Sequence, residues 1–157
     1  MRADNTQKQY ADSFTVNYEP RIRNVRVSSG GIDKQTYLRD MYTNDDGEMI
    51  CQICKEEMPF KKRDGEYYFE SVQLWSPSNG EKEHEAKYLA LCPVCAAKYK
   101  EFVSRGEKEE SFRDAVQTCD DLEIPIELGD ENATVSFVEK HLIDLQAIIN
   151  FNYENAL

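Results

Sequence analysis

Apolar residues in the first third of the chain recur at helical spacing. Tyr37, Leu38 and Met41 fall at three- and four-residue intervals and so share one face of a helix. Asp33 stands where its side chain can cap the start of that helix, and the polar run at 44–47 can end it. The pattern predicts a short helix that begins after Asp33.

Three further helices are predicted in the second half of the chain. The first covers residues 93–104 and begins with Pro93, which the first helical position tolerates. The second covers 107–118, although its acidic start also fits a solvated run. The third closes the chain. The side chains expected to face inward are Cys95, Tyr99, Phe102 and Val103 in the first of these helices and Leu142, Leu145, Ile148 and Ile149 in the last.

Strands are predicted where β-forming residues lie between turn residues. Residues 67–75 are rich in such residues and follow a turn at 61–65. Segments 124–128 and 134–138 bracket Gly129-Asp130-Glu131-Asn132, which predicts a hairpin.

The N-terminal segment has a different character. Residues 1–20 mix polar and aromatic types without a sustained period, which indicates a flexible arm. In residues 21–27, Ile22 can stand apart from the arginines around it, as in an extended segment. We expect one α+β domain over residues 21–157.

Composition and charge limit the kinds of molecule that this protein is expected to bind. The 157 residues are 40% hydrophobic and carry a net charge of −11, most of it in the last third of the chain. Such a surface repels phosphate backbones, which argues against nucleic-acid binding. No apolar run is long enough to cross a bilayer. We expect a cytoplasmic protein in a reducing compartment, where five cysteines are not expected to form disulfides.

Two C-x-x-C pairs carry the clearest chemistry. Cys51 and Cys54 form the first pair, and Cys92 and Cys95 form the second after a 37-residue spacer. Four thiolates make a closed tetrahedral site, so we predict one structural Zn²⁺ ion, with iron as the weaker alternative. A redox dithiol or unconnected free cysteines are the other interpretations. Cys119 has no partner at ligand spacing and is expected to be a buried or partly exposed thiol.

The long spacer indicates the architecture around this site. A knuckle, a β-hairpin and a helix that starts at the second cysteine pair would use all 37 residues, which is the arrangement called a treble clef. We expect the treble clef to cover residues 48–104. An N-terminal helix and a C-terminal hairpin plus helix, residues 107–150, would flank it.

This stretch resembles a known family. The segments 51–54 (Cys-Gln-Ile-Cys), 67–74 (Tyr-Tyr-Phe-Glu-Ser-Val-Gln-Leu) and 88–95 (Tyr-Leu-Ala-Leu-Cys-Pro-Val-Cys) resemble HNH endonucleases of the four-cysteine treble-clef type. In that family a histidine pair closes the strand, an asparagine precedes the leucine before the second cysteine pair, and a histidine follows the last cysteine. The histidines activate water and hold a divalent metal against the phosphate.

The catalytic positions of the family are replaced in this chain. Val72 and Gln73 stand where the histidine pair would be, Lys87 where the asparagine would be and Ala96 where the last histidine would be. None can act as a base at neutral pH, and Gln73 alone could be a weak metal ligand. Glu70 matches the family, although an exposed strand residue is the simpler interpretation. The resemblance therefore implies a degenerate, non-catalytic scaffold.

More loosely, the chain resembles the C-terminal region of large bacterial proteins whose front end is a sacsin-like, Hsp90-type ATP-binding domain. That resemblance implies that this chain is a tail which binds a partner protein or its parent ATP-binding domain. The function we expect is a structural zinc-binding interaction or scaffold module. The alternative is a divergent metal-dependent endonuclease acting on DNA through residues such as Glu70 and His84.

The remaining polar residues have plainer interpretations. His84 is expected to be a solvated loop histidine and His141 a surface or interface contact near the start of the last helix. The basic groups 21–26 and 61–63 are the places where an anion could dock, but short groups of this kind are usually strand edges and turns. The acidic last third is most simply a solvated surface.

Overall fold

The computed structural model describes residues 2–12, 33–77 and 81–154. The chain divides into two compact units, Met1–Gly31 and Ile32–Leu157. In the first unit, Arg2–Asp12 forms helix α1, which the sequence pattern did not predict. The interpretation of residues 1–20 as a flexible arm stays a prediction. The extended segment expected at 21–27 lies outside the described residues.

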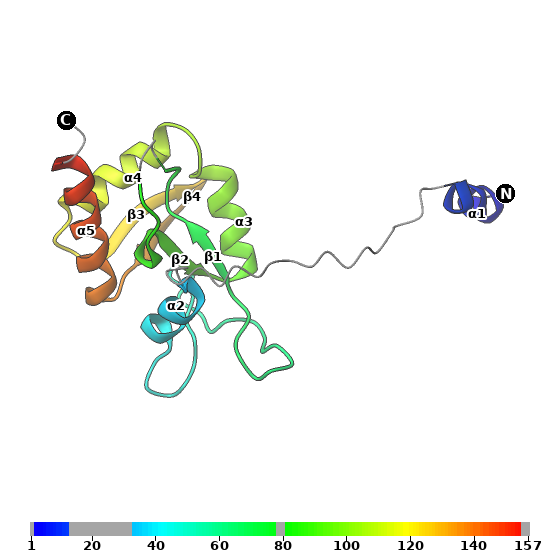
Figure 1. Ribbon diagram of the computed structural model, residues 1–157, viewed down its shortest axis with the longest axis horizontal. Coiled ribbons are helices and arrows are strands. Elements are labelled where there is room, and N and C mark those ends of the chain that lie inside the picture. Colours follow the sequence, from blue (N-terminus) through cyan, green and yellow to red (C-terminus); the bar gives the residue numbers. More distant parts are fainter. Residues whose placement is uncertain (1, 13–32, 78–80, 155–157) are drawn as a thin grey trace. The chain divides into compact units, whose positions relative to one another are not determined.

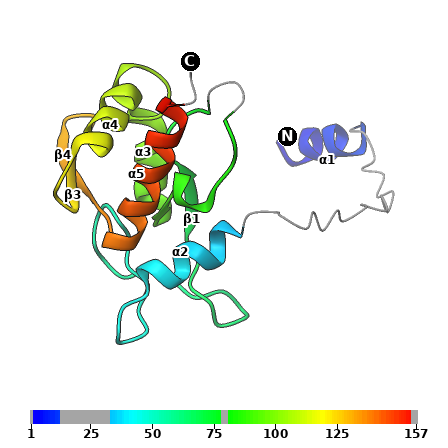
Figure 2. The ribbon, with the colours of Figure 1, turned by 60° about the vertical axis from the view of Figure 1, so that its left-hand side comes forward.

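The second unit confirms the predicted α+β class. It combines helices with two separate antiparallel β-hairpins, β1–β2 and β3–β4. Helix α3 contacts strands of both hairpins (Figure 1), and α5 packs against α4 (Figure 2). The elements are α2 (Lys34–Tyr42), β1 (Glu70–Gln73), the 3-10 turn η1 (Glu85–Lys87), β2 (Tyr88–Leu91), α3 (Pro93–Phe102), α4 (Glu107–Thr118), β3 (Glu123–Leu128), β4 (Glu131–Ser136) and α5 (Glu139–Glu154).

Helix α2 begins and ends where the sequence predicts. The Asp33 carboxylate accepts a hydrogen bond from the Thr36 N–H at 3.0 Å, which caps the first turn. Leu38 and Tyr42 are buried, while Tyr37 and Met41 pack at the margin of the core.

The strand predicted over residues 67–75 is shorter in the structure. Only Glu70–Gln73 forms β1, paired with β2 in a register that places Val72 opposite Leu89. The preceding residues pair elsewhere, because Tyr67 bridges Lys61 and the Tyr68 N–H donates to the Phe60 carbonyl at 3.0 Å. The first part of the predicted strand therefore pairs with residues 60–61 and the second part with β2. The periodicity of the sequence alone does not reveal this change.

Helices α3 and α4 agree with the predicted ranges. Pro93 occupies the first turn of α3, and Tyr99 and Val103 are buried as expected. Phe102 is 43% exposed, so its predicted inward position is wrong. Its ring lies over Gly129, where an added Cβ atom would come within 3.1 Å of it. A side chain at position 129 would therefore displace Phe102.

The C-terminal hairpin is tighter than predicted. Strands β3 and β4 are joined by Gly129 and Asp130 alone, because Glu131 pairs with Leu128 and extends the second strand. Gly129 has φ +65°, the conformation that two-residue hairpin turns require and that glycine adopts at least cost. Pro125 sits within β3 opposite Thr134.

Helix α5 supplies much of the apolar packing at the C-terminal end. Leu142, Leu145 and Ile149 are buried, as predicted, and Ile148 is partly buried. Within the described residues, no helix combines the length and the apolar character needed to cross a bilayer.

His141 is fully buried at the start of α5, so its predicted surface position is wrong. Its Nε2 lies 2.9 Å from the Ala86 carbonyl and its Nδ1 2.5 Å from the Tyr42 hydroxyl. A carbonyl can only accept, so Nε2 carries the proton and Nδ1 accepts from Tyr42. Helical periodicity could not find this role, because both partners come from distant segments.

The buried imidazole predicts a loss of stability in acid. Burial lowers the pKa of His141 to about 4, against about 6.5 in the unfolded chain. The unfolded state therefore binds the proton first, and the His141 contribution is lost as the pH falls from 6.5 towards 4. The free energy of unfolding is expected to fall by roughly 3 kcal/mol. Urea unfolding at pH 7 and pH 4.5 should show a loss of stability that is smaller in His141→Gln by about this amount, since the other titrating groups are common to both proteins; an equal dependence in both proteins would contradict it.

Candidate metal centre

The first cysteine pair lies in a tight turn between α2 and β1. The Cys51 N–H donates to the Glu56 carbonyl at 2.9 Å, and the Lys55 N–H donates back to the Cys51 carbonyl at 3.0 Å. Lys55 has φ +63°, a left-handed conformation that closes the turn. This reversal directs Cys51 and Cys54 to the same side of the loop.

The second pair is set by the start of α3. Cys92 is the residue that caps the helix, and its sulfur accepts a hydrogen bond from the Cys95 N–H at 3.5 Å. Pro93 fixes the first helical position between them. Cap and first turn therefore present both sulfur atoms on one side of the helix end.

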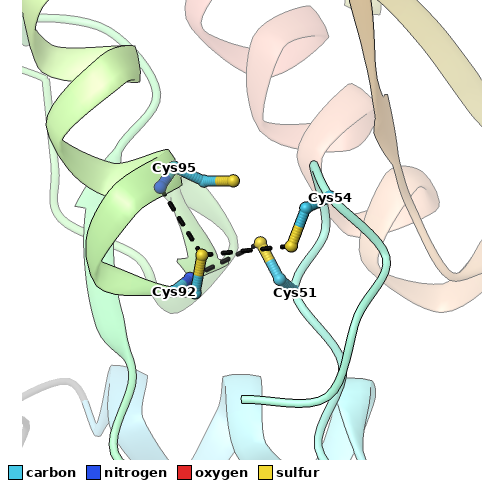
Figure 3. Close-up of side chains that lie close together, drawn as sticks. All are labelled: Cys51, Cys54, Cys92 and Cys95. Carbon is cyan, nitrogen blue, oxygen red and sulfur yellow. Dashed lines mark hydrogen bonds between the residues drawn. The ribbon is translucent and has the colours of Figure 1, made fainter. Parts of the chain in front are cut away.

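The four predicted metal ligands lie close together in the structure. The sulfur atoms of Cys51, Cys54, Cys92 and Cys95 all lie within 4.8 Å of one another, and Figure 3 shows the loop and the helix end presenting them to a common centre. Cys54 Sγ and Cys92 Sγ are 3.9 Å apart. A tetrahedral zinc ion with Zn–S bonds of about 2.3 Å needs sulfur atoms about 3.8 Å apart. The cluster could therefore hold one zinc ion.

Hydrogen bonds to its sulfur favour the thiolate form of one ligand, Cys51. The N–H groups of Ile53 and Cys92 each lie 3.4 Å from the Cys51 sulfur. The Cys95 thiol donates to the same sulfur and, with these N–H groups, lowers the pKa of Cys51 to about 5. The donated hydrogen bond raises the pKa of Cys95, and desolvation raises that of Cys54 to about 11. A divalent cation would stabilise all four as thiolates.

Gln52, between the first two cysteines, connects the centre to both hairpins. Its side-chain carbonyl accepts from the Ala90 N–H at 2.8 Å, and its amide donates to the Ser136 carbonyl at 3.0 Å. Its backbone also bonds to Ala90 and Ser136. Gln52 is 1% exposed. The sequence analysis missed this positioning role. The sign of it in the sequence is a polar residue, Gln52, between the two cysteines of the first C-x-x-C motif.

The residues at which the sequence resemblance expects catalytic groups have structural roles in the fold. Val72 and Ala96 are buried in the hydrophobic core. Lys87 is 3% exposed and lies 3.2 Å from the Glu81 carboxylate, a buried ion pair that the sequence analysis did not predict. Glu70 pairs with Lys100 at 3.3 Å on the surface. No cluster of histidines and carboxylates with metal-ligand spacing occurs in the described part of the chain.

Three other groups that were candidates in the sequence make ordinary structural contacts: His84, Cys119 and the basic residues 61–63. His84 is half-buried, and its Nδ1 accepts the Ala86 N–H at 3.0 Å at the start of η1. Cys119 is half-buried, as predicted, and donates to the Val116 carbonyl at 3.3 Å. The basic group at 61–63 is exposed, with Lys61 over the Tyr67 ring and Lys62 paired to Asp64.

Comparisons with protein-family models, with curated proteins and with solved structures give no match to this chain. The class that the fold and the site define is an α+β protein with a four-cysteine cluster suited to a structural metal ion.

Proposed function

We propose that this chain is a structural zinc-binding module that serves protein interaction or scaffolding. The convergence of four thiols from two segments separated by 37 residues carries this proposal. Four sulfur ligands complete a tetrahedron and leave no open position for water or substrate, which is typical of structural sites. The zinc ion would supply a cross-link between the loop at 51–54 and the start of α3.

The surroundings of the centre support a structural role. Cys51 and Cys95 are buried in the same core as the hairpin strands, and Gln52 extends the centre to β2 and β4. The order of knuckle, hairpin and helix is the order expected of a degenerate HNH-like treble clef. We propose no nuclease activity, because the positions where the resemblance expects catalytic residues hold Val72, Gln73, Lys87 and Ala96.

The partner that we propose is a protein, in a bacterial cytoplasm that keeps the thiols reduced. A parent ATP-binding domain, to which this module would be attached as a C-terminal region, is one such partner. The exposed face of α4 carries Glu107, Glu110 and Asp114, which favours a basic protein surface over a phosphate backbone.

The test is a native mass spectrum of the purified full chain, with and without a strong chelator, followed by thermal melts of both samples. We expect one zinc ion per chain and a melting transition that collapses on chelation, because metal binding energy is folding energy in such modules. A chain that carries no metal and melts unchanged in chelator would overturn the zinc proposal.

A further inference from the structure

The four cysteines differ sharply in their access to solvent. Cys51 and Cys95 are 1% and 6% exposed, Cys92 is half-buried and Cys54 is exposed. The more exposed side of the proposed zinc centre is therefore formed by one cysteine residue from each pair. A small oxidant would reach the centre through Cys54.

The exposed sulfur has a neighbour suited to trap an oxidised form. Cys54 Sγ lies 3.9 Å from Cys92 Sγ, the more accessible sulfur of the second pair. The buried Cys51 sulfur accepts from two N–H groups, those of Ile53 and Cys92, whereas the Cys92 sulfur accepts one, from Cys95, and its residue is more exposed. Hydrogen bonds and burial reduce the reactivity of a thiolate towards electrophiles. The geometry thus favours a bond between the two pairs over a bond within either pair.

We propose that Cys54 is an oxidation site and that peroxide converts Cys54 and Cys92 into a disulfide with release of the zinc ion. This inference rests on the proposed zinc centre. A bound zinc ion would keep both sulfurs as thiolates, the form that reacts with peroxide.

The reaction balances with one peroxide per chain. The Cys54 thiolate attacks one peroxide oxygen, an S–O bond forms, the O–O bond breaks and hydroxide leaves. The Cys92 thiolate then attacks the Cys54 sulfur, an S–S bond forms, the S–O bond breaks and a second hydroxide leaves. The sulfurs lose two electrons, peroxide gains them, and the two hydroxides take up two protons to give water. Zinc departs because only two thiolates remain.

The disulfide would join the same two segments that zinc joins. It links the loop at 51–54 to the start of α3 and leaves Cys51 and Cys95 reduced. A covalent link would therefore replace the metal and close the same long loop. We expect the oxidised chain to melt between the zinc-loaded and the chelated chain, and to regain zinc after reduction with dithiothreitol and added zinc.

The experiment uses the full chain with Cys119→Ser, so that no fifth thiol interferes. Zinc loading is first verified by native mass spectrometry. Hydrogen peroxide is then titrated while a chromophoric chelator reports zinc release, and free thiols are alkylated before tryptic digestion without reductant. We expect one zinc released per peroxide consumed and a cross-link between peptides 40–55 and 88–98, with fragment ions that place it at Cys54 and Cys92.

Cys54→His is the matched variant, because a site of three cysteines and one histidine still binds zinc. Zinc release by peroxide should slow at least tenfold in this variant. Disulfides confined to peptide 40–55 or to peptide 88–98, or a bond that uses Cys51 or Cys95, would overturn the inference. Release from Cys54→His at the unchanged rate would also do so. A chain that holds no zinc before peroxide is added would instead overturn the proposed function.

Discussion

Zinc content and folding are expected to fall together in a Cys51→Ser variant. Cys51 is almost fully buried, and serine replaces its sulfur with an oxygen that stays protonated and binds zinc poorly. Structural zinc contributes on the order of 10 kcal/mol to folding, which rivals the whole stability of an ordinary domain. We expect bound zinc to be lost and the cooperative thermal melt to disappear, as measured by native mass spectrometry and circular dichroism.

Cys119→Ser provides the matched control for this substitution. Cys119 is half-buried and lies outside the cluster, with a hydrogen bond to the Val116 carbonyl that a serine hydroxyl can also make. This variant should retain one zinc ion and melt within a few degrees of the wild type. If Cys51→Ser kept its zinc and its melting temperature, the assignment of Cys51 as a ligand would be wrong.

Removing the buried lysine should produce the second large effect. The side chains of Lys87 and Glu81 are 3% and 4% exposed and lie 3.2 Å apart. In Lys87→Met the Glu81 carboxylate stays buried without its nearest cation, although Arg113 lies 3.9 Å away and Asn152 donates to it at 2.8 Å. Loss of one partner from a buried pair typically costs several kcal/mol. We expect the free energy of unfolding to fall by about 3 kcal/mol in urea titrations.

Two further variants separate the charge effect from a packing effect. The double variant Glu81→Gln, Lys87→Met removes both charges and should recover part of the loss, because a neutral amide is cheaper to bury than a carboxylate. Lys100→Met breaks the exposed ion pair with Glu70 and should change stability by less than about 1 kcal/mol. Equal losses in Lys87→Met and Lys100→Met would contradict the special role of the buried pair.

The sequence predicted those parts of the molecule that local interactions determine. The Asp33 cap and the apolar spacing after it lie within a few residues of α2, and Pro93 lies within the first turn of α3. The bounds of α4, Glu107–Thr118, match the predicted range, and the acidic residues in its first turn are a local feature that favours this start. The cysteine pairs were also predictable, because each C-x-x-C motif contains its own turn geometry.

Features that depend on distant partners could not be predicted in this way. His141 contacts Tyr42 and Ala86, which lie 99 and 55 residues away in the sequence. Gln52 bonds to Ala90 and Ser136, and Lys87 is buried because folding places Glu81 beside it. Each of these polar residues looks solvent-exposed in the sequence, and only the tertiary structure supplies its partner.

The proline in β3 limits how this protein can assemble with other chains. Exposed strand edges can template sheet growth, and a strand added along β3 would need backbone donors there. Pro125 pairs with Thr134 of β4 but offers no N–H to a neighbour on its other side. A missing N–H at this position therefore weakens any sheet that would grow from copies of this chain along β3.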